Sequence, residues 1–521
     1  MSSPRRILAA ATVLHAVVGA WIATSITGPL LAIDDLAYLS MGRTLAGGGA
    51  APLGAQPPYG VLYPTLLAPG WLMGLDESQM IVFAQLVNAV LGAALLPVLF
   101  ALVRRLSDAS FGRALGAATI GASLPAALLT GSIVWTERLL PLLTALAVLA
   151  LLRVRDEASL RHGAEVAAVV AALVATHPRT IVVAAVVLLA ALGIAGRRGS
   201  LRVGVAAALL GAVGVGLGEI ARRALTDRTF GADATYDAAD LAGRRGFDDA
   251  TEMLVKGGGT VAYLVLATAG LAVLGAVLLS RHRAIAITYG AMVVATVAMA
   301  GWFLAGVERA DSYLHGRYIE TLAPLLVTLG VVAAARLPWR TSALVLSGSV
   351  VAAGIYGAWA GGGDNWADPR TPVMMLGVDV SGAPLAGSVF QPGAAAAVGV
   401  VAGLVILAAA RGGVWEAPVV MSLLVAMAVI SGTATIDSLR DQTTVGWVQT
   451  SLADVEIDAL LVDSRVPSTL VGAVAWEVGF DRTTTDRLAA VTHQLLPPDA
   501  VAPDGATAAV EFGEGTLWAL P

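Results

Sequence analysis

Long apolar runs constrain this chain more than any motif does. Runs near the length of a membrane span recur at 7–26, 79–103, 112–131, 133–152, 163–177, 180–196, 203–221, 260–279, 284–305, 318–335, 341–359, 393–410 and 415–435. A bilayer core takes about 20 helical residues to cross. Only 13% of the residues are charged, whereas soluble domains average roughly a quarter. The sequence therefore predicts an all-α polytopic protein of the lipid bilayer with about thirteen transmembrane helices.

The amino terminus and the residue types narrow the class further. Arg5 and Arg6 lead into the first run, as in a signal peptide, but no small-residue cleavage site is convincing and we expect the run to be retained. The chain has no cysteine, which excludes a disulfide, a thiolate nucleophile and a cysteine-ligated metal. Its richness in Ala, Val, Gly and Arg is typical of a GC-rich genome. We expect a bacterial plasma-membrane protein without a nucleic-acid partner.

Basic residues predict the orientation. They fall at alternate ends of successive runs, at Arg5/Arg6, Arg104/Arg105/Arg113, Arg153/Arg155, Arg197/Arg198/Arg202, Arg281/Arg283, Arg336/Arg340 and Arg411. Those ends should be cytoplasmic, which leaves the polar motifs in the external loops. We expect a transmembrane domain at 1–436, with its longest external loop at 28–78, and a small extracytoplasmic α/β domain at 437–521. Strands are expected at 455–462, 473–478, 508–512 and 516–521.

The first external loop opens with two adjacent carboxylates, Asp34 and Asp35, directly after an apolar helix. Ionised side chains at a bilayer edge repel each other and resist desolvation, so we expect them to be hydrated, paired or engaged in chemistry. Asp34 could instead cap the helix that follows, and Asp35 could be a solvated neighbour. That helix contains Tyr38 and ends at 47–49 in three glycines. A proline-rich segment with Tyr59 and Tyr63 comes next, and its alternative interpretation is an interfacial anchor.

Three later motifs fall on the same side of the membrane. They are Trp135-Thr136-Glu137-Arg138, His177-Pro178-Arg179, and the segment from Arg309 through His315-Gly316-Arg317-Tyr318-Ile319-Glu320. Glu137 is either a substrate ligand or half of an interfacial ion pair. Arg179 is hard to explain as a topogenic charge on the external side, and Arg317 can reach a phosphate bidentately. His315 is expected to be a polar bridge rather than a metal ligand.

The segment 222–259 mixes charges densely and ends in Lys256-Gly257-Gly258-Gly259. It is interpreted as a solvated surface helix. The alternative is a mobile flap that covers a bound substrate. It is not a phosphate loop, because the Walker Gly-Lys-Ser/Thr ending is missing.

Together, the acidic pair, the tyrosine-containing helix and the three motifs resemble the GT-C superfamily of membrane glycosyltransferases over about 1–335. The resemblance implies transfer of a sugar from a polyprenyl-phosphate donor to an acceptor hydroxyl of a cell-envelope glycan, lipid or protein. Asp34 would be the general base of an inverting reaction, supported by Asp35. The expected substrate-binding residues are Tyr38, Tyr59, Tyr63, Glu137, His177, Arg179, Arg309, His315, Arg317 and Tyr318.

The resemblance requires no cofactor or metal, and nothing indicates a divalent cation. Arabinosyl-, aminoarabinosyl- and mannosyltransferases all fit, so the sugar stays open. The competing hypothesis is a lipid-linked-sugar flippase or another transporter. A transporter should place ionisable residues near the bilayer midplane or in broken helices of two related halves, whereas this sequence concentrates them at one membrane face.

Overall fold

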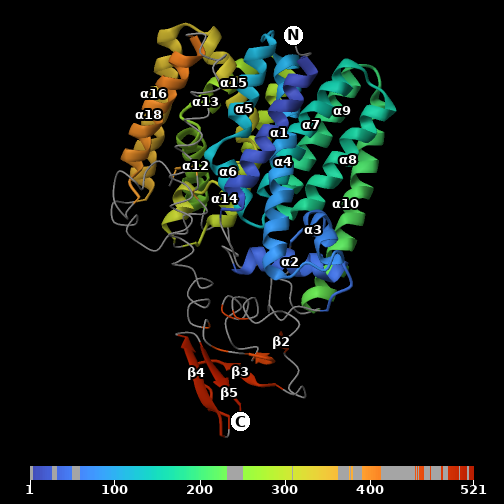
Figure 1. Ribbon diagram of the computed structural model, residues 1–521. Coiled ribbons are helices and arrows are strands. Elements are labelled where there is room, and N and C mark those ends of the chain that lie inside the picture. Colours follow the sequence, from blue (N-terminus) through green and yellow to red (C-terminus); the bar gives the residue numbers. More distant parts are fainter. Residues whose placement is uncertain are drawn as a thin grey trace.

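The computed structural model describes most of the chain. The described residues are 4–25, 32–49, 59–231, 250–307, 309–361, 375, 377–378, 390–411, 452, 455, 457–462, 470, 474, 483–484, 491–503, 505–512 and 515–520. A helical bundle occupies most of the described part, and a small sheet lies beyond one of its ends (Figure 1).

The bundle is built from helices of very different length. They are α1 (Pro4–Ala23), α2 (Ala32–Leu45), α3 (Leu62–Leu72), α4 (Glu77–Leu106), α5 (Phe111–Ala122), α6 (Pro125–Leu129), α7 (Leu139–Asp156), α8 (Leu160–Thr176), α9 (Ile181–Arg197), α10 (Leu201–Phe230), α12 (Ala250–Ala267), α13 (Leu271–Leu279), α14 (Arg283–Leu304), α15 (Ala323–Arg336), α16 (Trp339–Ala360) and α18 (Pro392–Arg411). Short 3-10 turns are η1 (Thr130–Ser132), η2 (Thr136–Arg138), η3 (Pro178–Thr180) and η5 (Ala310–Leu314).

The bundle fits a multi-pass membrane protein. Within the described ranges, seven helices are long and apolar enough to cross a membrane, or up to nine if each of two bent pairs is one span. The outer faces of α1 and α10 expose large apolar side chains, among them Val13, Trp21, Leu209 and Leu217. Such a surface suits lipid rather than water. The expected count of about thirteen is not confirmed, and the expected span 415–435 lies outside the described residues.

Several expected spans are broken, and the breaks have physical causes. The run 112–131 divides into α5 and α6 with a bend of 61°, where Pro125 begins a new helix. The run 260–279 bends by 98° at Gly270, whose φ of 77° is left-handed. The runs expected at 133 and 318 become helical only at Leu139 and Ala323. In both, a polar motif occupies the residues that the sequence pattern assigned to a helix.

The segment 222–259, interpreted as a solvated surface helix, is helical where it is described but is not solvated throughout, because Lys256 is buried. Residues 222–230 continue α10, and residues 250–259 belong to α12, so the triple glycine is helical. Residues 232–249 lie outside the described part of the chain. The expectation of solvation had rested on charge density, which does not show which charged residues the packing of helices buries.

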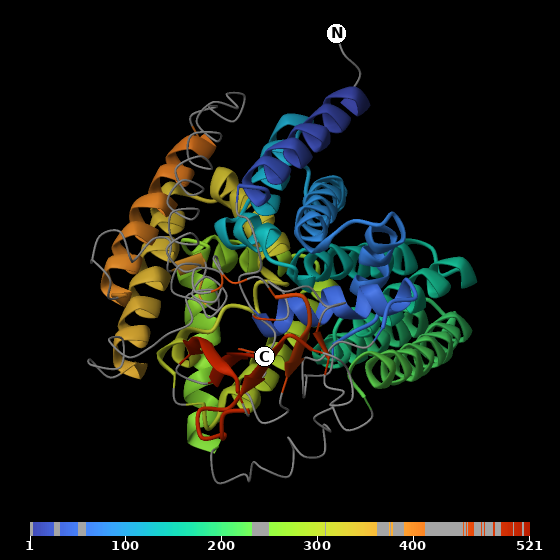
Figure 2. The ribbon, with the colours of Figure 1, turned by 60° about the horizontal axis from the view of Figure 1, so that its bottom comes forward.

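The two ends of the bundle differ in chemistry. The basic ends of α4 and α7 meet where Arg105 pairs with Asp156 at 3.5 Å, and Arg411 at the end of α18 donates to the Ala334 carbonyl of α15 at 3.2 Å. At the opposite end, α2 lies across the bundle beside α3 (Figures 1 and 2). The side chains from Asp35 to Met41 in α2 are buried. The motifs of interest gather at this second end.

The C-terminal part contains a five-stranded sheet in the order β2-β1-β3-β5-β4. The strands are β1 (Leu460–Val462), β2 (Thr483–Thr484), β3 (His493–Leu496), β4 (Thr507–Phe512) and β5 (Gly515–Ala519). β1 pairs in parallel with β2 and β3, and β5 is antiparallel to β3 and β4. The strands expected near 508–512 and 516–521 are confirmed, the one at 455–462 is shorter, and β2 and β3 were missed. Of the strand expected at 473–478, only Val474 is described, and it is helical rather than extended.

Candidate active site

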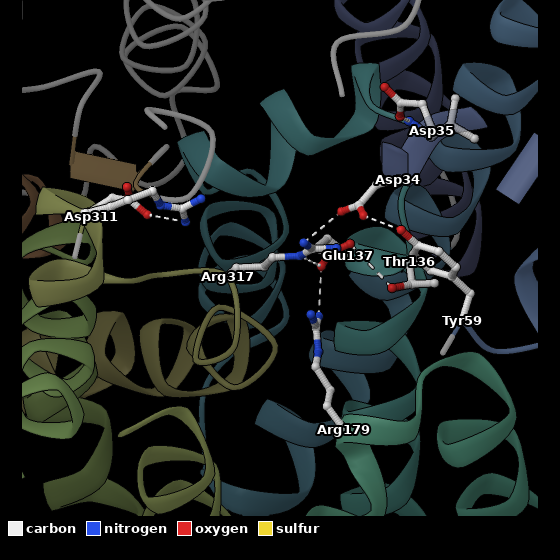
Figure 3. A network of polar contacts seen from close by, with 10 residues as sticks. Asp34, Asp35, Tyr59, Thr136, Glu137, Arg179, Asp311 and Arg317 are labelled. Atoms are coloured by element: carbon white, nitrogen blue, oxygen red, sulfur yellow. Dashed lines mark hydrogen bonds and ion pairs between the residues drawn. The ribbon is translucent and has the colours of Figure 1, made fainter. Parts of the chain in front are cut away.

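Asp34 stands in the first turn of α2, at the end of the bundle that carries the polar motifs. One carboxylate oxygen accepts a 2.6 Å hydrogen bond from the Tyr59 hydroxyl, and the other lies 2.8 Å from Nη1 of Arg317 (Figure 3). A helix N-terminus favours a carboxylate there. Its side chain keeps 14% of its accessible surface, so Asp34 is held in place and still accessible.

Arg317 connects Asp34 to a second carboxylate. Its Nε donates to Oε1 of Glu137 at 2.8 Å, and the same oxygen accepts from Nη2 of Arg179 at 2.8 Å. The order Asp34–Arg317–Glu137–Arg179 alternates anion and cation, and dashed lines in Figure 3 mark the contacts that connect the four side chains. We call these residues the ion-pair chain. They come from four separate segments, and their formal charges cancel.

Local interruptions of the helices position the residues of the ion-pair chain. Glu137 sits in η2 ahead of α7, so the polar motif turns inward before the apolar helix begins. Arg179 sits in η3, where Pro178 ends the run of α8 and His177 Nδ1 accepts from the Arg179 amide at 3.2 Å. Arg317 lies in the turns that precede α15. Three interruptions of helices therefore converge on one site.

The residues of the ion-pair chain stabilise one another in their charged forms. Burial raises the pKa of Glu137, but Arg317 and Arg179 outweigh it and bring that pKa to about 2. Burial likewise lowers the pKa of Arg317, and Asp34 and Glu137 reverse this and hold it well above its usual value. The Arg317 guanidinium also lies 4.0 Å from the ring centre of Trp135, a cation–π contact. Both groups are therefore ionised at neutral pH.

Asp35 has a different position from its neighbour. Its side chain is fully buried and accepts a 2.7 Å hydrogen bond from the backbone amide of Val134 (Figure 3). That bond fastens α2 to the segment that leads into Glu137. The geometry gives Asp35 a supporting position rather than contact with the ion-pair chain.

The three tyrosines of the first loop form one aromatic group. The ring of Tyr38 lies 4.8 Å from that of Tyr59 and 5.3 Å from that of Tyr63, both edge to face. The Tyr63 hydroxyl donates to Asn88 Oδ1 at 2.9 Å, and Asn88 in turn donates to the Ile133 carbonyl at 2.8 Å. Burial and Asp34 raise the pKa of Tyr59 well above its usual value. Tyr59 therefore donates a hydrogen bond to Asp34, and the other two rings support it.

The remaining residues predicted to bind substrate lie around the ion-pair chain and are not part of it. The His315 ring is buried and lies 4.8 Å from that of Tyr318, over which Arg179 sits at 5.1 Å. Burial, then Arg317, lower the pKa of His315 to about 3, and burial and Arg179 lower that of His177 well below its usual value. Both histidines are neutral at pH 7. Arg309 pairs with Asp311 at 2.9 Å instead of entering the site.

Comparisons with known proteins were made for sequence and for structure. No family model and no curated protein matches the chain. ArnT from Cupriavidus metallidurans bound to undecaprenyl phosphate superposes with a TM-score of 0.54 over 99% of this chain and 98% of that one, at 14% identity. The apo state of the same protein gives 0.54 at 16% identity, over 98% and 97%. The chain has a GT-C fold. Arabinosyltransferase EmbB from Mycobacterium smegmatis gives 0.46 over 96% of this chain and 44% of that one, at 14% identity.

A second polar group in this GT-C fold was missed as a site by sequence reasoning. The buried Tyr263 hydroxyl of α12 donates to Oε1 of Glu320, and the Gly377 amide donates to that hydroxyl at 2.8 Å. Burial raises the pKa of Glu320 to about 7. Glu320 closes the motif that begins at His315, which was the only available signal. Tyr263 lies far from any motif in sequence.

A small pocket is lined by residues of both polar groups. Glu137 and Glu320 both line it, along with Tyr263 and mostly apolar residues of α6, α12 and α15. Among the residues that the structure describes, no group of three or more His, Asp or Glu is arranged to hold a metal ion.

Proposed function

We propose that this chain is an inverting glycosyltransferase that moves a sugar from a polyprenyl-phosphate donor to an acceptor hydroxyl, with Asp34 as general base. The observation that carries the proposal is the ion-pair chain, in which the partly accessible Asp34 carboxylate contacts Arg317, and Arg317 shares Glu137 with Arg179. Its support is the shared fold with ArnT, a protein solved with undecaprenyl phosphate bound.

The chemistry needs both kinds of charge. The acceptor oxygen forms a bond to the anomeric carbon and passes its proton to Asp34, while the bond from that carbon to the phosphate oxygen breaks and its electron pair leaves with the phosphate. Arg317 and Arg179 would hold the phosphate and stabilise its growing negative charge. Attack opposite the leaving group inverts the anomeric centre. The arginines supply the positive charge, so the proposal requires no metal or cofactor.

The pairing of Arg317 suggests how the base becomes available. In this structure Arg317 binds Asp34 and Glu137 at once. A donor phosphate would compete with Asp34 for the Nη1 of Arg317, whereas Glu137 keeps its Nε. The Asp34 carboxylate would then be free for the acceptor hydroxyl while Tyr59 still orients it. Donor binding would therefore precede general-base catalysis.

Orientation and location follow from the charges. The basic residues in the last turns of α4, α7 and α18 lie at the end of the bundle opposite the ion-pair chain, and the positive-inside rule would assign that end to the cytoplasm. The site and the C-terminal domain would then face outward, at a bacterial plasma membrane. The acceptor would be a hydroxyl of a cell-envelope glycan, lipid or protein. Pentose and hexose donors both remain candidates for the sugar.

The test uses purified chain in proteoliposomes with labelled polyprenyl-phosphate sugars and envelope acceptors. Sugar transfer by the wild type and its loss in Asp34→Asn are expected, and mass spectrometry of copurified lipid should identify a polyprenyl phosphate. Translocation of the donor across the membrane without transfer would contradict the enzyme and favour a flippase. Full transfer by Asp34→Asn would refute Asp34 as the base.

A further inference from the structure

The sequence Lys256-Gly257-Gly258-Gly259 has no part in the ion-pair chain and yet is buried in the helical bundle. It lies in α12, in one of the two bent helix pairs that are apolar enough to span a membrane. Lys256 has no accessible surface. A buried lysine is costly unless its ammonium is fully paired. Its partners therefore indicate why it stands there.

The ammonium of Lys256 is bound by the segment that leads to Arg317. It donates to the carbonyls of Leu304 at 2.9 Å and Val307 at 2.6 Å, and lies 2.5 Å from Oε1 of Glu252 one turn earlier in α12. Three partners match the three N–H donors of an ammonium. The other carboxylate oxygen of Glu252 accepts from the Gly306 amide at 3.0 Å. Lys256 and Glu252 together hold residues 304–307 against α12.

Each of the three glycines faces a different neighbour. A Cβ on Gly257 would meet Val297 of α14 at 3.3 Å, and one on Gly258 would overlap the hydroxyl of Tyr356 in α16. A Cβ on Gly259 would overlap the carbonyl oxygen of Tyr313 in η5. Because that oxygen belongs to the backbone, it could move away only if the η5 backbone shifted as well. α12 therefore binds the start of the 304–314 segment through Lys256 and accepts its end at Gly259.

We propose that Lys256 is a positioning residue that fixes the 304–317 segment on α12 and thereby sets the place of Arg317. The segment is also closed on itself, because Ser312 Oγ donates to the Arg309 carbonyl at 2.7 Å. Arg317 follows Tyr313 by four residues and must meet two carboxylates, each at 2.8 Å. A displacement of about 1 Å in such a contact can cost on the order of 10² in rate.

The role in donor binding rests on the proposed function, but the positioning itself is measurable without it. The chain has no cysteine, so nitroxide labels attach only to introduced ones. Labels at Arg309→Cys and at Leu344→Cys on the exposed face of α16 report the distance from the segment to a neighbouring helix. This distance is measured in the otherwise wild-type chain and in Lys256→Met. Binding of undecaprenyl phosphate is measured in parallel on unlabelled Lys256→Met.

Lys256→Met is expected to widen the distance distribution and to weaken undecaprenyl phosphate binding by about tenfold or more. Glu252→Gln, at a half-exposed side chain, should give smaller changes in the same direction and serves if Lys256→Met fails to fold. Arg153→Met, which breaks an ion pair with Glu165 at the basic end, is the matched control and should change neither.

An unchanged distribution in Lys256→Met overturns the positioning role. A wider distribution with unchanged lipid binding overturns the link to Arg317. If the wild type binds no undecaprenyl phosphate, the proposed function fails at its donor step. The label distances then still decide whether Lys256 fixes the segment.

Discussion

Replacing Glu137 by glutamine tests the ion-pair chain most directly. Glutamine keeps the shape of the side chain but removes the charge that two guanidinium groups share. The side chains of Glu137, Arg179 and Arg317 retain only 3%, 8% and 12% of their accessible surface, so little water can replace the lost partner. Removing one member of a buried pair typically costs about 3–5 kcal/mol.

The pKa of Glu137 supports the same magnitude. Each pKa unit corresponds to about 1.4 kcal/mol, so a decrease from 4.5 to about 2 favours the folded ionised form by about 3 kcal/mol. Because the folded pKa is the lower one, this contribution is complete above pH 4.5 and disappears as the pH falls through about 2. The loss of folding stability in Glu137→Gln should therefore be complete at pH 7 and become smaller below pH 4.5.

The assay is thermal unfolding of the purified chain in detergent at pH 7 and at lower pH. Glu165→Gln is the matched control, since Glu165 also accepts from an arginine at 2.8 Å but keeps 26% of its side-chain surface. Glu165→Gln should lower the free energy of unfolding by less than about 1 kcal/mol. Equal effects of the two substitutions, or a Glu137→Gln deficit that does not change with pH, would refute the reasoning.

A double substitution adds an internal check. Arg179→Met in the Glu137→Gln background removes a cation that glutamine leaves unpaired. The double variant should therefore lose less folding stability than the sum of the losses in the two single variants. Strict additivity would show that Arg179 and Glu137 are not coupled in stability, against the 2.8 Å contact.

Three further predictions concern the reaction and its pH dependence. Asp34→Asn should lower the transfer rate by about 10²–10⁴-fold while donor binding survives, and the wild-type product should carry the inverted anomeric configuration, which nuclear magnetic resonance can determine. Alanine at Arg179 or Arg317 should weaken donor binding and lysine should restore only part of it, because an ammonium lacks the planar fork; unchanged transfer in both alanine variants would contradict this. Glu320, whose folded pKa is raised to about 7, should destabilise the fold increasingly as the pH rises from about 4.5 to 7. Glu320→Gln should therefore raise the melting temperature more at pH 8 than at pH 5, and an equal shift at both values would argue against a raised pKa of the Glu320 carboxyl group.

The sequence alone predicted the class of protein and the end at which its polar motifs collect. Span-length hydrophobicity is a local property, so the apolar runs were visible without any tertiary contact. The order of the motifs was sufficient to suggest the GT-C fold that the superposition confirms. The number of spans was not predictable in the same way, because the bend at Gly270 and the break before Leu139 depend on what the neighbouring helices require.

Only the tertiary structure decided which charges meet. Arg179 lies 42 residues and Arg317 180 residues from Glu137, and no local pattern shows that both bind one of its oxygens. The division between Asp34 and Asp35 was likewise invisible, since consecutive helical residues point about 100° apart and their partners come from distant segments. Lys256 was interpreted as part of a solvated surface helix, whereas its ammonium is buried and bound by backbone carbonyls. Hydrophobic burial adds up along the chain, whereas the partner of a charge is determined by the packing of segments far apart in sequence.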